Sequence, residues 1–154
     1  MTEYKSINNE KLVSDITNWD TSRVTTMKGM FSYTSNFNQD ITNWDTSNVT
    51  NMEDMFLSCY DFSINLFGLD VSKVTNTNHM FYKCFKFNGT VPAFGPLLQS
   101  AIRMFYDCTI FNQPLSHLDV SGLQNANSMF LACTTFNQDI SGWRPQITNA
   151  NSMF

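Results

Sequence analysis

The sequence predicts a mixed α+β repeat fold, in which six coils of 24 to 25 residues stack into a solenoid. The first observation is a recurring Met–Phe pair, whose phenylalanines are Phe31, Phe56, Phe81, Phe105, Phe130 and Phe154. The second is that other apolar columns keep the same step, for example Ile16, Ile41, Leu66, Val91, Leu115 and Ile140. Because one such coil cannot bury its own apolar face, we expect each coil to bury it against its neighbours.

Within a coil, the residue pattern predicts short strands and one short helical turn. Residues 37–44 carry Ile41 in a polar setting, which is typical of a short strand, and residues 49–52 are expected to form a second one. The intervening Asp45-Thr46-Ser47 is turn chemistry, because Asp and Ser side chains can bond the backbone two residues on. Apolar residues at 52, 55, 56 and 59 follow helical spacing, so a helical turn is expected to close the coil.

Composition and length restrict the class of protein. The chain has 154 residues, only 14% of them charged, and a net charge of -4. This acidic balance argues against a nucleic-acid partner, since phosphate binding needs clustered Lys and Arg. No apolar run approaches the roughly 18 residues that a membrane helix needs, so membrane insertion is not expected. The start of the chain also lacks the layout of a signal peptide.

The repeat also divides the chain into two parts. Residues 1–14 do not join the repeat and are polar apart from Leu12 and Val13, so we interpret them as an N-terminal cap over the first coil. Residues 15–154 form the six repeats, of which the last is expected to be incomplete.

The unit FNQDITNWDTSNVTNMEDMFLSC, at residues 37–59, resembles the repeat of BspA-like surface proteins. It is most similar to the mycoplasma-type 25-residue variant, a domain of unknown function related to leucine-rich repeats. The resemblance spans roughly residues 15–154. It implies a right-handed leucine-rich-repeat-like solenoid, with a role in adhesion or protein–protein contact rather than catalysis. Such proteins are found on bacterial and some protist surfaces and are encoded by giant DNA viruses.

The cysteines occupy a single column of the repeat, at Cys59, Cys84, Cys108 and Cys133. Stacked side chains that all point the same way favour a ladder of buried free thiols. Disulfides remain an alternative, and metal binding is a weaker one because one column cannot surround a tetrahedral ion. Reduced thiols suggest an intracellular or virion-interior location, whereas a cell-surface location would need another export route.

A second polar column contains the carboxylates Asp20, Asp45, Asp70 and Asp119. Capping of each coil's own turn explains this column, and calcium binding is the alternative. The two histidines, His79 and His117, fall at unlike repeat positions and are interpreted as surface residues. The sequence shows no nucleophile–base pair, phosphate-binding loop or paired carboxylates, so we expect neither enzyme activity nor a cofactor.

The first functional hypothesis is therefore a non-enzymatic module that binds other proteins through the solenoid flank. Residues that break the repeat are the best candidates for contact, because the consensus positions already serve folding. The fourth copy loses its Trp-Asp-Thr-Ser turn over residues 91–100, which selects Pro92, Phe94, Pro96, Leu97 and Gln99. Decay of this copy, or a kink in the rod, would give the same pattern.

The second hypothesis is a structural component of a larger assembly, such as a minor protein of a giant virus particle. The last copy ends at Phe154 without a polar cap, and an open coil end exposes strand edges and apolar side chains. Copies of this chain, or particle proteins, are the expected partners at that end.

Overall fold

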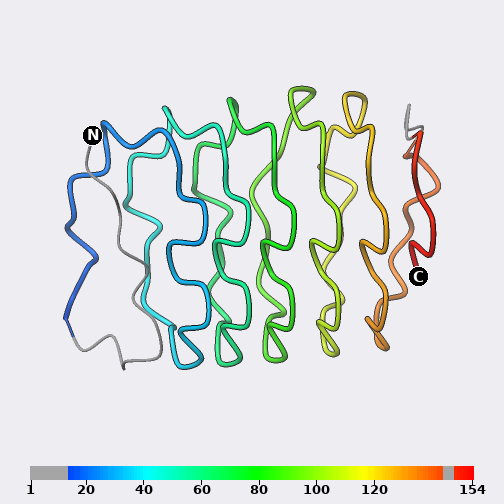
Figure 1. Cartoon of the computed structure of the whole chain (residues 1–154), viewed down its shortest axis with the longest axis horizontal. Coiled ribbons are helices and arrows are strands. Elements are labelled where there is room, and N and C mark those ends of the chain that lie inside the picture. The colour runs from blue at the N-terminus through cyan, green and yellow to red at the C-terminus, as the bar shows by residue number, and fades with distance from the viewer. Residues whose placement is uncertain (1–13, 144–147) are drawn as a thin grey trace.

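The computed structural model describes residues 14–143 and 148–154. Coils of backbone stack side by side along the long axis, in chain order from blue at one end to red at the other (Figure 1). Single parallel bridges join each coil to the next, through Thr26, Asn51, Asn76, Ser100, Asn125 and Asn149. We number the coils 1 to 6 by these residues. Each coil therefore holds one copy of the sequence repeat.

The prediction of an α+β solenoid with strands and helical turns was wrong. Across 14–143 and 148–154 there is no helix, and the only β structure is the row of isolated bridges. The expected helical turn at 52–59 is a run of hydrogen-bonded turns. The expected strand at 37–44 is a loop and turn, and the one at 49–52 is reduced to the bridge at Asn51. The fold is thus a stack of loops rather than the leucine-rich-repeat-like architecture that the resemblance implied.

Backbone hydrogen bonding explains why the helix does not form. We call residues 27–34, and their equivalents 52–59, 77–84, 101–108 and 126–133, the turn segments. In the first of these, the N–H groups of residues 27, 29, 31 and 33 donate to carbonyls of coil 2 at 2.7–2.9 Å. The N–H groups of residues 30, 32 and 34 donate three residues back within coil 1. The N–H groups therefore alternate between hydrogen bonds to the next coil and hydrogen bonds within the turn. Buried backbone groups are thus satisfied without an α-helix.

This alternation needs two residues in the left-handed region in each turn segment, four positions apart. Positive φ occurs at Gly29, Asp54, His79, Arg103, Ser128 and Ser152, and again four residues later at Tyr33, Ser58, Lys83, Asp107 and Ala132. Most non-glycine residues reach this region only at a cost. The inter-coil hydrogen bonds, repeated in each coil, hold them there. Because each turn segment contains two left-handed residues, its buried apolar side chains are spaced three and four residues apart, as they would be in a helix.

The bridge residue begins each turn segment. Asn51 accepts a hydrogen bond at Oδ1 from the N–H of Glu53, at 2.8 Å, and Asn76 does the same with Asn78 at 2.9 Å. Asn side chains favour such local turns because they mimic a backbone carbonyl. The recurrent Asn at this position therefore ends the extended bridge and starts the turns.

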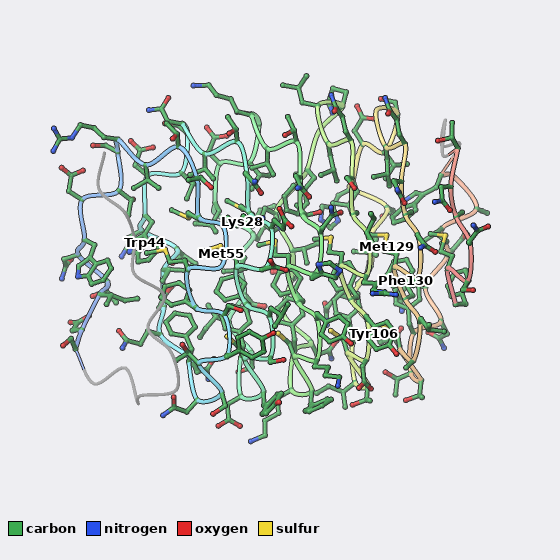
Figure 2. All side chains as sticks on the ribbon, viewed as in Figure 1. Lys28, Trp44, Met55, Tyr106, Met129 and Phe130 are labelled. Carbon is green, nitrogen blue, oxygen red and sulfur yellow. The ribbon has the colours of Figure 1, made fainter. Side chains whose placement is uncertain are left out.

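The core lies inside the coils and is built from two columns of phenylalanine. The first contains Phe31, Phe56, Phe81, Phe105 and Phe130, with successive ring centroids 5.5–5.8 Å apart. The second contains Phe37, Phe62, Phe87, Phe111 and Phe136, and within each coil the two rings stack at 3.8–4.3 Å. Figure 2 places Met55, Met129 and Phe130 in this interior, where all three are buried. The periodic apolar positions of the sequence are thus core positions.

The boundaries of the predicted parts remain a prediction. The proposed cap at 1–14 lies outside the described residues except for Ser14. Within the described part of the chain, no helix is long and apolar enough to cross a membrane.

Candidate protein-binding face

Side chains that do not follow the repeat gather over the turn segments of coils 1 to 4. Four of the five tyrosines of the chain are among them. We call this surface the tyrosine face and define it as Tyr33, Tyr60, Tyr82, Phe85 and Tyr106 with His79, Lys83 and Arg103. It lies beside a groove of about 520 Å³, which is lined by six of these residues, all but Phe85 and Tyr106, together with Glu53, Asp54, Leu57 and Ser58.

Aromatic rings of adjacent coils stack on this face. Tyr82 and Tyr106 lie parallel with centroids 4.7 Å apart, and Tyr60 and Phe85 lie 5.0 Å apart. Tyr33 is 55% exposed and Tyr60 is 42% exposed. Figure 2 labels Tyr106 on this part of the stack. Stacking fixes the rings before any partner arrives, so a partner would order little on binding.

The acidic groups beside the groove already have partners. Glu53 accepts from the Lys28 ammonium at 2.9 Å, and Asp54 lies 3.1 Å from Nδ1 of His79. His79 also meets the edge of the Tyr82 ring. The sequence placed His79 simply on the surface, whereas the structure shows it half-buried and bonded.

The basic groups are arranged differently. Lys83 Nζ lies 5.6 Å from the centre of the Tyr82 ring, and the Arg103 guanidinium lies 6.0 Å from that of Tyr106. Such cation–ring contacts are attractive but leave hydrogen-bond donors free. Within 14–143 and 148–154, neither cation forms an ion pair. The face therefore presents two free cations on a stacked aromatic base.

The segment selected from the sequence, residues 91–100, divides into buried and exposed positions. Pro92 is buried and Phe94 is 1% exposed, so both belong to the core and are not available to a partner. Pro96, Leu97 and Gln99 are exposed, Leu97 by 52%. Phe154 is 64% exposed, with one side of its ring stacked on Phe130 at 5.7 Å. The sequence-predicted residues thus do not form one surface.

The carboxylate column lies at exposed turns, where each Asp accepts from the residue two positions on. Asp45 Oδ1 accepts from the N–H of Ser47 at 3.0 Å and from its hydroxyl at 2.6 Å. Equivalent backbone bonds join Asp20 to Ser22, Asp70 to Ser72 and Asp119 to Ser121. The hydroxyl and backbone hydrogen bonds lower the pKa of Asp45 below its usual value. Among the described residues, no group of three or more His, Cys, Asp or Glu is placed to hold a metal ion.

The thiol column lies in the core. Cys59, Cys84, Cys108 and Cys133 are all free and buried. Each Sγ donates to a phenylalanine carbonyl of the preceding coil at 2.7–3.1 Å. Burial raises the pKa of Cys59 and of Cys133 to about 12, and raises the pKa of Cys84 and Cys108 well above the ordinary range. These thiols are therefore structural and poorly nucleophilic.

Comparison with known proteins gives one match. The family described as "Mycoplasma protein of unknown function, DUF285" matches residues 2–95 and 98–154. The chain belongs to this family. The mycoplasma-type repeat expected from the sequence is thereby confirmed, and the family carries no assigned function. The interruption of the match falls at Pro96 and Leu97, inside the segment where the repeat consensus is lost. No curated protein and no solved structure matches the chain.

Sequence reasoning missed the tyrosine face, although a signal was present. Every described tyrosine falls within the five residues that follow a Met–Phe pair, for example Tyr82 after Phe81 and Tyr106 after Phe105. The charge of this stretch also differs between copies, with Lys83 and Lys86 in one copy and Asp107 in the next. The sequence did not indicate a shared surface, because in the expected helical turn these side chains would point to different faces.

Proposed function

We propose that this DUF285 protein is a non-enzymatic repeat scaffold that binds other proteins through the tyrosine face. The observation that carries the proposal is the stacked pair Tyr82–Tyr106, whose rings are both half-buried, with Lys83 and Arg103 lying over them. Tyrosine and arginine, like tryptophan, are enriched at protein-binding hot spots. The consensus positions serve the core, whereas these side chains are not needed to close the coils.

The form of the stack supports the same role. Parallel coils fix successive side chains at regular intervals, which gives an extended and rigid surface of the kind that repeat proteins use for binding. The groove beside Tyr33 and Tyr60 adds a concave part to this surface. In its more specific form, the proposal is that the chain is related to BspA-like surface proteins and that its protein binding serves adhesion.

Cross-linking mass spectrometry on the native source material tests the proposal. Partner links are expected within residues 53–60, 79–85 and 103–107, and they should disappear in a Tyr82→Ala/Tyr106→Ala double variant. Asn48→Ala is the matched control, because Asn48 is exposed and lies on the turn beside Asp45, outside the tyrosine face. Circular dichroism and melting must show that both variants remain folded.

Two results would contradict the proposed face. Links that survive the double variant would show that the tyrosine face is not the contact surface. Links confined to the coil end at Phe154, running to further copies or to particle proteins, would instead support a structural role in a larger assembly.

A further inference from the structure

We propose that the tyrosine face recognises an acidic, extended peptide segment of its partner, with Arg103 and Lys83 as the carboxylate-binding residues. This inference rests on the proposed function and specifies the chemistry of the partner. It begins from a difference between the acidic and the basic side chains of this surface: within 14–143 and 148–154, the acids are paired and the two cations are not. The acids Glu53 and Asp54 are engaged by Lys28 and His79, whereas the two cations have no acidic partner among the described residues.

The free cations are placed for recognition of a carboxylate. Both follow from the coil geometry, because Lys83 and Arg103 occupy the two left-handed positions of successive turn segments. Each side chain lies over a tyrosine ring, which restricts its movement while its N–H donors stay available. A guanidinium can bind a carboxylate through two parallel hydrogen bonds, and an ammonium adds a third donor group. The two residues can therefore bind neighbouring carboxylates of one chain.

The groove determines the form of the segment. It runs beside Tyr33, Tyr60 and Tyr82, and its volume of about 520 Å³ suits a few residues of peptide rather than a folded domain. Exposed aromatic rings supply contact area for the aliphatic parts of such a peptide. The paired acids Glu53 and Asp54 line the same groove, so a basic segment would have to compete with Lys28 and His79.

Asp107 is the acid that could weaken this argument. It follows Lys83 in the same repeat column, at the next left-handed position. Its carboxylate is nevertheless not within ion-pair distance of Lys83 or Arg103. A partner carboxylate would therefore bind beside this negative charge. The hydrogen-bond donors of Lys83 and Arg103 nevertheless stay without an acidic partner in the described part of the chain, and the proposal rests on these donors.

The test is an ¹H–¹⁵N NMR titration of the whole chain with three matched peptides. All three are extended and contain one tyrosine, and they carry glutamate, glutamine or lysine at the other positions. The glutamate peptide is expected to bind most tightly, with shifts at the amides of Lys83, Arg103 and Tyr106. We expect Arg103→Ala and Lys83→Ala each to weaken binding about tenfold, and the double variant to abolish it.

Lys86→Ala is the matched control, because Lys86 is exposed and already paired with Asp61 at 2.7 Å. It should bind the glutamate peptide like the unmodified chain. Equal binding of the three peptides, tighter binding of the lysine peptide, or full binding by the double variant would each overturn the assignment. A dimer in sedimentation that masks the tyrosine face would also overturn it, since the occupant would then be a second copy.

The two proposals can fail separately. If cross-links to a partner map to the tyrosine face but are unchanged in the Lys83→Ala/Arg103→Ala variant, the binding function stands and the acidic chemistry is wrong. If no cross-link involves the tyrosine face in the native material, the proposed function itself fails.

Discussion

The thiol of Cys84 donates a hydrogen bond to the carbonyl oxygen of Phe56 in the preceding coil, at 3.1 Å. The same oxygen accepts the N–H of Cys59 at 2.9 Å, so the thiol uses its second lone pair. Equivalent bonds join Cys59 to Phe31, Cys108 to Phe81 and Cys133 to Phe105. The cysteine column therefore connects five successive coils through the core, although none of its members is cross-linked to another.

Replacing Cys84 tests how much this bond and the packing of sulfur contribute. Cys84→Ala removes the donor and leaves a small cavity, so we expect a loss of about 1–3 kcal/mol of unfolding free energy. Cys84→Thr should lose less, because Thr34 occupies the same column in coil 1 while only 1% exposed. Urea denaturation measures both. Equal losses for the two variants would show that the donor contributes nothing.

The raised thiol pKa values predict a loss of stability at alkaline pH. A folded pKa of about 12 at Cys59 and Cys133, against 9.0 for a free thiol, means that the unfolded chain releases protons first. Their contribution is fully present below about pH 9 and is lost as the pH rises towards 12, by up to ~1.4 kcal/mol per pH unit for each thiol. The measurement is denaturation between pH 8 and 10.5.

A variant with threonine at all four cysteine positions is the control for this prediction. Its stability should fall less over the same range, because it has no thiols to ionise. Some loss should remain, because tyrosines and lysines titrate in both proteins. Parallel curves would contradict the assignment. At pH 8 the native thiols should also react slowly with a disulfide reagent and rapidly once the chain is unfolded.

The periodic columns of the sequence identified the core but not the backbone conformation. Phe31, Met55 and Cys84 were correctly placed as buried, stacked residues, because burial depends only on the period of the repeat. The prediction of a helical turn was wrong because apolar spacing of three and four residues also arises when turns alternate with left-handed residues. Only the inter-coil hydrogen bonds distinguish the two, and these depend on residues some 24 positions away.

Gly122 is required by the irregular fourth copy. A Cβ at this position would lie 1.8 Å from the carbonyl oxygen of Pro96, which is backbone and cannot move aside cheaply. Other copies carry Arg23, Asn48 or Lys73 here. Gly122 in coil 5 therefore leaves room for the altered turn around Pro96 in coil 4. The two coils are packed specifically against each other at this point.

We expect Gly122→Ala to lower the unfolding free energy by about 1–3 kcal/mol, in the range of other overpacking substitutions. Gly95→Ala is the matched control, since no atom lies within 4 Å of a Cβ there. It should change stability by only a few tenths of a kcal/mol. Urea midpoints compare the two, and a neutral Gly122→Ala would mean that coil 4 shifts freely.

The aspartate turns predict a local dependence on acid. Hydrogen bonds from Ser47 lower the pKa of Asp45 from the ordinary 3.8. The stabilisation is therefore present above about pH 4 and is lost as the pH falls through the folded pKa. In Ser47→Ala, the pKa of Asp45 should rise towards 3.8 while that of Asp119 stays unchanged, as followed by carbon-detected NMR titration. An unchanged Asp45 would exclude the serine as the cause.

The phenylalanine columns predict that the cost of a core substitution depends on its place in the stack. Phe81 in coil 3 stacks on Phe56 and Phe105 in the neighbouring coils, at 5.6 and 5.5 Å. Phe136, near one end of the described stack, has one such neighbour in the adjacent coil, Phe111 at 5.9 Å, and is only partly buried. Repeat proteins are stabilised by nearest-neighbour interfaces, so Phe81→Leu breaks two interfaces and Phe136→Leu breaks one.

We therefore expect Phe81→Leu to cost about twice as much as Phe136→Leu, with each lost ring pair worth roughly 0.5–1.5 kcal/mol. Leucine keeps the site apolar, so that both variants are expected to fold. Hydrogen exchange adds a second measurement: protection should fall on both sides of coil 3 in Phe81→Leu, but only near coils 5 and 6 in Phe136→Leu. Equal costs with uniform loss of protection would mean that the stack unfolds as one cooperative unit, in which position along the axis has no influence.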